Sequence, residues 1–165
     1  MNTTTRAEHF VWMIQHHPEW DGFSLEPHRA LTRARSRSIQ EANDLTRQLK
    51  THWLKQIGPE QKSAMVLHNA AMFFAIREPE FAATLLKRAI ELDPAEPLYV
   101  ERLRLVYIGA QTPAQFLVSY GVVDSAERTA FAEQASASLK SDPAFQRYSD
   151  PEISPRFRND SCRVQ

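Results

Sequence analysis

Prolines and glycines punctuate this chain and leave long uninterrupted segments between them. Only 4 glycines occur in the 165 residues, and the 10 prolines fall between the segments with helical periodicity rather than inside them. Proline removes a backbone donor and clashes inside a helix, and glycine costs about 1 kcal/mol there. No segment shows the strict alternation of apolar and polar residues that is typical of a strand. The sequence therefore predicts an all-α fold.

Local capping signals and apolar residues three or four positions apart predict the helix boundaries. The predicted helices cover residues 5–17, 24–57, 60–77, 79–92, 97–109, 113–121 and 126–140. Asp124 or Ser125 is expected to cap the last helix, with Glu127 answering Asp124 in a capping box. Short connections between long helices predict antiparallel hairpins.

The length fits one domain of ordinary size. We expect residues 1–148 to form this single all-α domain. Residues 149–165 contain Pro151, Pro155 and mostly polar side chains, so we expect a poorly ordered tail there.

Small and bulky residues recur where the two helices of one predicted hairpin would meet. They are Ala70, Ala82 and Ala89, with Phe73 and Leu86 facing them. Two helices pack about 8–10 Å apart, and small residues at the contact allow the closer spacing. With Pro94 after the second helix, residues 63–94 resemble one unit of the tetratricopeptide (TPR) family, a helix–turn–helix repeated about every 34 residues.

The resemblance implies a TPR-like right-handed α-solenoid fragment with atypical flanking helices. Asn69, Val66 and Pro79 depart from the family, which prefers leucine, tryptophan and an aromatic residue at these positions. The next unit is half a match, because Arg104 occupies a position where the family has a small residue. One repeat cannot bury its faces alone, so flanking helices are expected to cover it.

The same resemblance implies a concave groove lined by the first helix of each hairpin. The residues that it places there are Leu67, Ala71, Phe74, Glu101, Leu105 and Ile108. This apolar surface would take an amphipathic helix or an extended peptide of a protein partner. We expect Leu67 and Phe74 to be partly exposed and Phe73 to face the helix 79–92. The alternative is that the helix 24–57 or the helix 126–140 already fills the groove.

A basic stripe lies on the long second predicted helix. Arg29, Arg33 and Arg37 recur every four residues and could bind a phosphate backbone or an acidic partner. Glu26 and Glu41 balance the stripe and the formal net charge is zero, so a solvated helix face is favoured and a nucleic-acid partner is not expected.

No catalytic residue, cofactor site or metal site is predicted. His9 and His16 stand two turns apart, about 10.5 Å, which is too far for one metal ion. Cys162 is the single cysteine, so no disulfide forms within the chain. Glycine-rich phosphate loops and nucleophile motifs do not occur. An enzyme with a dispersed site between helices stays an alternative.

The leading hypothesis is a non-enzymatic protein–protein interaction scaffold. The alternatives are a regulatory or nucleic-acid-associated helical protein and an enzyme with a dispersed site. The longest apolar run near the start, residues 10–14, is too short for a signal peptide or a membrane span, so we expect no membrane partner and a cytoplasmic location.

Overall fold

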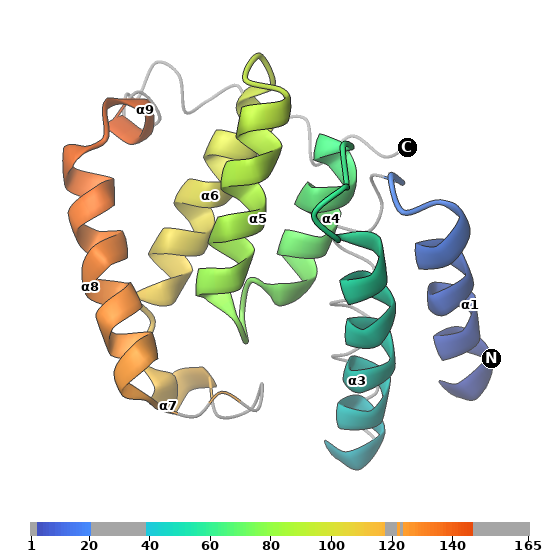
Figure 1. Ribbon diagram of the computed structural model, residues 1–165. Helices are drawn as coiled ribbons and strands as arrows, with labels where there is room; N and C mark the ends of the chain where they lie inside the picture. The colour runs from blue at the N-terminus through green and yellow to red at the C-terminus, as the bar shows by residue number, and fades with distance from the viewer. Residues whose placement is uncertain (1–2, 21–38, 118–121, 123, 147–165) are drawn as a thin grey trace, which may run out of the picture.

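The computed structural model describes residues 3–20, 39–117, 122 and 124–146. The helices in these ranges are α1 (Thr3–His16), α3 (Ile39–Gln56), α4 (Ala64–Phe74), α5 (Pro79–Leu92), α6 (Pro97–Ala110), α7 (Ala114–Leu117), α8 (Ala126–Ser141) and α9 (Pro143–Gln146) (Figure 1). No strand occurs in the described ranges, which confirms the all-α prediction. None of the helices described there is both long enough and apolar enough to cross a bilayer.

The helices that begin at strong local signals have the predicted boundaries. Helix α5 begins at Pro79 and ends at Leu92, as predicted, and α6 begins at the predicted Pro97. Helix α4 is shorter than the predicted 60–77, because Ser63 caps it by accepting a hydrogen bond from the Val66 N–H. Of the predicted helix 24–57, the segment before residue 39 lies outside the described residues.

The start of α8 confirms one of its two predicted caps but not the predicted capping box. Ser125 is the N-cap, and its hydroxyl accepts from the Arg128 N–H at 3.2 Å. The capping box between Asp124 and Glu127 is therefore wrong, since the third helical position holds Arg128. The pKa of Glu127 is lowered first by its own backbone N–H and then by Ser125.

A short helix that the sequence did not predict follows α8. The carboxylate of Asp142 accepts from the Ala144 N–H at 2.8 Å and starts α9. Phe145 of α9 is buried, and its ring lies edge-on to Tyr107 of α6, with centroids 5.6 Å apart. The predicted tail from residue 149 lies outside the described residues.

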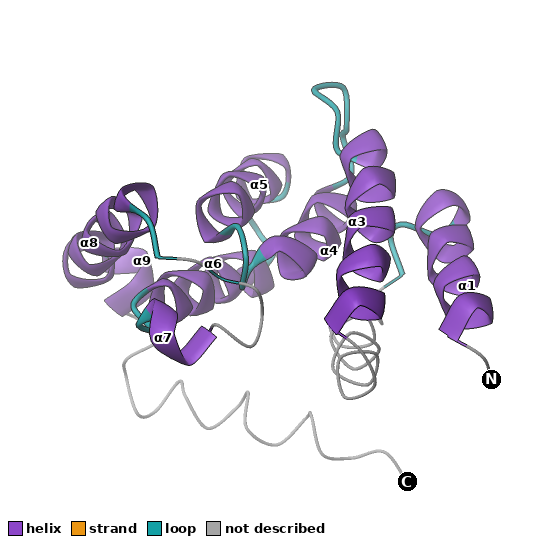
Figure 2. Ribbon diagram, turned by 90° about the horizontal axis from the view of Figure 1, so that it is seen from below, coloured by secondary structure: helices purple, strands orange, loops and turns teal. Residues whose placement is uncertain are grey.

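Consecutive helices pack side by side in an antiparallel manner. Helix α4 packs on α5, α5 on α6 and α6 on α8; α1 also packs on α3, but these two helices run in the same direction (Figure 1). Viewed from below, the helices follow one another from α8 through α6 and α5 to α4, α3 and α1 (Figure 2). Helices α4 and α6 consequently run in the same direction on either side of α5.

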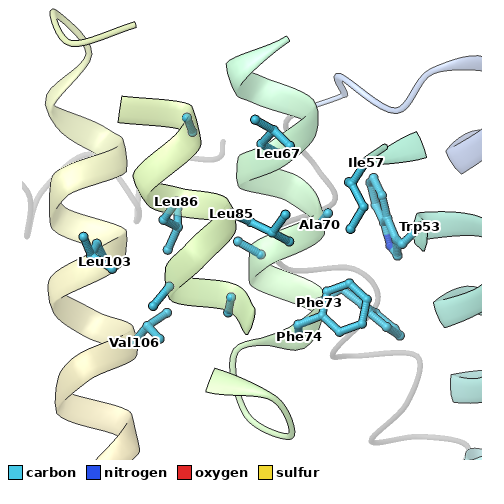
Figure 3. Close-up of a cluster of buried hydrophobic side chains, with 14 of the residues drawn as sticks. Trp53, Ile57, Leu67, Ala70, Phe73, Phe74, Leu85, Leu86, Leu103 and Val106 are labelled. Carbon is cyan, nitrogen blue, oxygen red and sulfur yellow. The ribbon is translucent and has the colours of Figure 1, made fainter. Parts of the chain in front are cut away.

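Helix α4 occupies the centre of the core. Its buried residues are Val66, Leu67, His68, Asn69, Ala70, Ala71, Phe73 and Phe74. Figure 3 shows Leu85 and Leu86 of α5 on one side of this helix and Trp53 and Ile57 from the α3 side on the other. A helix covered on most of its sides is apolar around most of its circumference, which the sequence of α4 satisfies apart from its two buried polar residues.

Two polar links fasten α3 to the α4–α5 hairpin. The Arg88 guanidinium of α5 donates to the carbonyls of Ile57, Gly58 and Pro59 at 3.3, 3.1 and 3.4 Å, just past the end of α3. The Lys50 ammonium donates to both carboxylate oxygens of Glu78 at 2.8 Å. Helix α3 is thus held at its C-terminal end and near its middle.

Candidate functional site

The three residues of α4 that were expected to line a groove lie in the core instead. Leu67 and Ala71 have 0% of their surface exposed and Phe74 has 1%. The Phe74 ring lies edge-on to the Phe81 ring, with centroids 4.9 Å apart, and the Lys50 ammonium of α3 lies 6.0 Å from its centroid. The expectation that Leu67 and Phe74 are partly exposed is wrong, because α3 and its neighbours cover this side of α4.

The three residues of α6 in the same predicted set reach the surface. Leu105 is 41% exposed and Ile108 is 44% exposed, and Glu101 is half-buried. The structure thus divides the predicted set into a buried half on α4 and an accessible half on α6. If a groove exists beside α6, its opposite side must be formed by residues other than Leu67, Ala71 and Phe74.

An apolar cavity of about 270 Å³ opens between α4, α6 and α7. Its lining residues are Met72, Ala75, Ile76, Leu105, Val106, Gly109, Thr112 and Leu117. We call this feature the α4–α6 groove; Ile108 is exposed three residues after Leu105 on α6 but does not line the cavity. Met72, Ala75 and Ile76 replace the predicted α4 residues in it, and no sequence signal separates them from the other apolar residues of that helix.

The two walls of the groove differ in their local structure. Met72 lies near the end of α4, and Ala75 and Ile76 follow it in the turn after that helix, whereas Leu105 and Gly109 lie one turn apart on α6. A Cβ added at Gly109 would meet no atom within 4 Å, so this glycine leaves open space in the groove wall.

One turn towards the start of each helix, the same two faces become polar. His68 precedes Met72 by four residues and Arg102 precedes Leu105 by three. His68 is buried, and its ring centroid lies 5.6 Å from that of Tyr99 on α6. The apolar cavity lies at the α7 end of these faces, and we call His68 and Arg102, which do not line the cavity, the polar end of the groove.

The hydrogen bonds of Asn69 define the tautomer of His68. The Asn69 side-chain N–H₂ donates to the carbonyls of Pro18 and Trp20, both at 2.9 Å, and this uses both of its hydrogens. Its Oδ1 must therefore accept from Nδ1–H of His68, at 3.2 Å. The other ring nitrogen, Nε2, then carries a lone pair, and it is buried without a hydrogen-bond partner.

Burial and charge keep the His68 ring neutral. Burial first, and then the nearby Arg102 guanidinium, lower the pKa of His68 from 6.5 to about 4. The Nε–H of Arg102 is itself buried without a hydrogen-bond partner. Among the described residues no carboxylate forms an ion pair with Arg102. The polar end of the groove thus holds a positive charge that the described part of the chain does not balance.

A larger cavity of about 560 Å³ lies between the starts of α5 and α8. Its lining residues are Arg77, Glu78, Pro79, Glu80, Phe81, Thr84, Val122, Ser125, Glu127, Arg128 and Phe131. The two arginines and three glutamates there do not favour one class of ligand, and Glu78 is already paired with Lys50. In the described ranges no group of three or more His, Cys, Asp or Glu side chains is placed to hold a metal ion.

The basic stripe of Arg29, Arg33 and Arg37 lies outside the described residues. The alternative that depends on it, a regulatory or nucleic-acid-associated protein, therefore stays a prediction. Comparison with protein families, with curated proteins and with solved structures found no match to this chain.

Proposed function

We propose that this protein is a non-enzymatic interaction scaffold that binds an apolar segment of a protein partner in the α4–α6 groove. The observation that carries the proposal is Leu105, a large aliphatic residue that is 41% exposed and lines an apolar cavity, with the exposed Ile108 three residues further along α6. Exposed apolar surface next to a concave pocket is typical of binding sites. The groove lies between α4 and α6, which both pack on α5, so its walls need little rearrangement to accept a ligand.

We further propose that α4 and α5 form one TPR-like hairpin. The alanines expected between the two helices, Ala70, Ala82 and Ala89, are all fully buried, as is Leu86. In a TPR-like array the first helices of successive hairpins line the concave face, and α4 and α6 would hold these positions. Asn69, which departs from the family's leucine, has a separate role here because it holds the chain after α1.

A display library of helical peptides, selected on the full chain, tests the binding function. A charged side chain in the groove should disrupt an apolar contact, so Leu105→Glu should weaken the selected peptides by roughly 30-fold, the equivalent of a 2 kcal/mol hot spot. The melting temperature of Leu105→Glu and of the control variant Leu92→Glu should stay within a few degrees of that of the natural chain, because exposed positions tolerate substitution.

Leu92→Glu is the matched control. Leu92 is 45% exposed, close to the value for Leu105, but it lies at the end of α5 and does not line the groove. Peptide affinity should be unchanged in this variant. If Leu92→Glu and Leu105→Glu reduce binding equally, or if neither does, the groove is not the binding surface.

A further inference from the structure

We propose that the partner segment is acidic as well as apolar, and that it places a carboxylate on Arg102 while its bulky apolar side chains occupy the α7 end of the groove. This inference rests on the proposed binding function and specifies the chemistry of the partner.

The first step is the unbalanced charge of Arg102. Its Nε–H is buried with no acceptor, and no described carboxylate pairs with it. Because that Nε atom is buried, an incoming group reaches the guanidinium at its two Nη atoms. Their N–H donors form a fork that matches a carboxylate, so an acidic side chain is the natural ligand.

The second step is that His68 does not compete for this role. His68 lies beside Arg102 and is uncharged at neutral pH, and its free Nε2 accepts a proton rather than donating one. An incoming carboxylate therefore finds its donors on Arg102. Tyr99 shares this end of the groove, and burial followed by Asp93 and Glu96 raises its pKa, so its hydroxyl also stays protonated.

The third step is spacing. At 1.5 Å per residue, the polar level of α4 at His68 lies about 6 Å from Met72 along the helix axis, and Ile76 lies four residues further on, in the turn that follows the helix. A helical partner lying along the groove covers that distance in four to eight residues. The partner is thus expected to carry Asp or Glu on the same face as bulky apolar residues, four to eight positions away.

The test is a display library of 16-residue helical peptides with randomised surface positions, selected on the full chain and on Arg102→Gln. Selection on the natural chain should enrich sequences with Asp or Glu four to eight positions from a large apolar residue. On Arg102→Gln the acidic preference should disappear while the apolar preference remains. A selected peptide should lose about tenfold in affinity when its acidic residue is replaced by the amide.

Arg104→Gln is the matched control, because it removes the same charge from the same helix without removing a residue of the groove face. It should keep the acidic preference. Arg102→Glu should instead select Lys or Arg at the position that was acidic, which also covers the case in which Arg102→Gln folds poorly.

The possible outcomes distinguish this inference from the proposed function. If Leu105→Glu abolishes binding but the acidic preference is absent, or is unchanged in Arg102→Gln, the groove binds peptides and the charge inference is wrong. If selected binding does not depend on Leu105, the proposed function itself fails. A concentration-dependent dimer that Leu105→Glu abolishes would overturn the inference, because a second copy would then cover the groove.

Discussion

Two adjacent phenylalanines on α4, Phe73 and Phe74, are both buried in the core. Their rings lie edge-on with centroids 5.0 Å apart. The resemblance to a TPR unit implied opposite roles for them, one in the core and one in a groove. Their shared burial follows from α3 covering the side of α4 that would face solvent in an isolated hairpin.

Truncation of Phe74 should therefore destabilise the fold. Phe74→Ala is expected to lower the free energy of unfolding by about 3–5 kcal/mol, as is Phe73→Ala, because each leaves a cavity in a packed core. Urea denaturation measures both. Phe116→Ala is the control, since Phe116 is 68% exposed and its loss should cost under about 0.5 kcal/mol. A stable Phe74→Ala variant would contradict the packing of α3 over α4.

His68 should make the stability of the protein depend on pH. Its pKa is lowered from 6.5 to about 4 in the folded state, so folding favours the neutral ring. The stability is therefore complete above pH 6.5 and is lost as the pH falls towards 4, by about 3 kcal/mol at most.

The measurement is the free energy of unfolding of the natural chain and of His68→Gln at pH 7 and pH 4.5. Glutamine does not titrate, so the loss between these two values should be smaller in the variant by about 2–3 kcal/mol. Equal losses in the two proteins would show that other groups control the acid sensitivity.

The C-terminal end of α3 is held by a side chain of another helix. The last carbonyls of a helix have no partner within it. Just past the end of α3, the carbonyls of Ile57, Gly58 and Pro59 receive hydrogen bonds from Arg88 of α5. The positive charge also suits the negative end of the α3 dipole. A single side chain thus stabilises a turn that is distant in sequence.

Replacing Arg88 with leucine should loosen this turn. The expected loss is about 1–2 kcal/mol, because hydrogen bonds to a charged group are worth more than neutral ones but this group is partly solvated. Hydrogen exchange should become faster at the amides of the last turn of α3. Lys87→Leu, at an exposed neighbouring position, should change stability by less than about 0.5 kcal/mol, and an equal effect of both variants would argue against the cap.

Gly109 offers a way to fill the groove without disturbing the helix. It is the next-to-last residue of α6, and a Cβ there would enter open space. Gly109→Leu is expected to keep stability or raise it by less than about 1 kcal/mol, because the penalty for glycine is smaller at a helix end than in the interior. The same side chain should occupy the groove and reduce peptide affinity at least tenfold in a fluorescence titration. Unchanged affinity would place the binding surface elsewhere.

At the level of the whole molecule, the row of helices continues past α6 through α8 and α9. Tyr107 of α6 makes edge-on contacts with Phe131 of α8 and Phe145 of α9, at centroid distances of 5.8 and 5.6 Å. This aromatic group closes the end of the core that lies furthest from α1. Through the buried Phe145, the four-residue α9 therefore contributes to the packing at this end of the core.

Two truncations test the contribution of α9. A chain that ends at Gln146 should be more stable than a chain that ends at Asp142 by about 3–5 kcal/mol, since only the first keeps the buried Phe145. Thermal melts of the two proteins give the comparison. Equal melting temperatures would mean that α9 does not pack on α6 in solution.

Local chemistry made much of the helical framework predictable. Proline at the first turn of α5 and α6, and serine at the caps of α4 and α8, act within one turn of the chain, so their effects are visible in the sequence. Helix α9 was not predicted, because a helix of four residues is too short to show a helical period in the sequence. Asp142 next to Pro143 was the only local signal of its start.

The position of the groove depended on contacts between distant segments. Helix α4 is apolar around most of its circumference, so periodicity could not say which of its faces meets solvent. Lys50 and Trp53 of α3, more than ten residues earlier in the chain, lie on the side of Phe73 and Phe74. That packing leaves Met72 and Ile76 beside Leu105 as the accessible wall. Burial depends on which elements arrive next to a helix, and this information lies in the packed molecule rather than in any single segment.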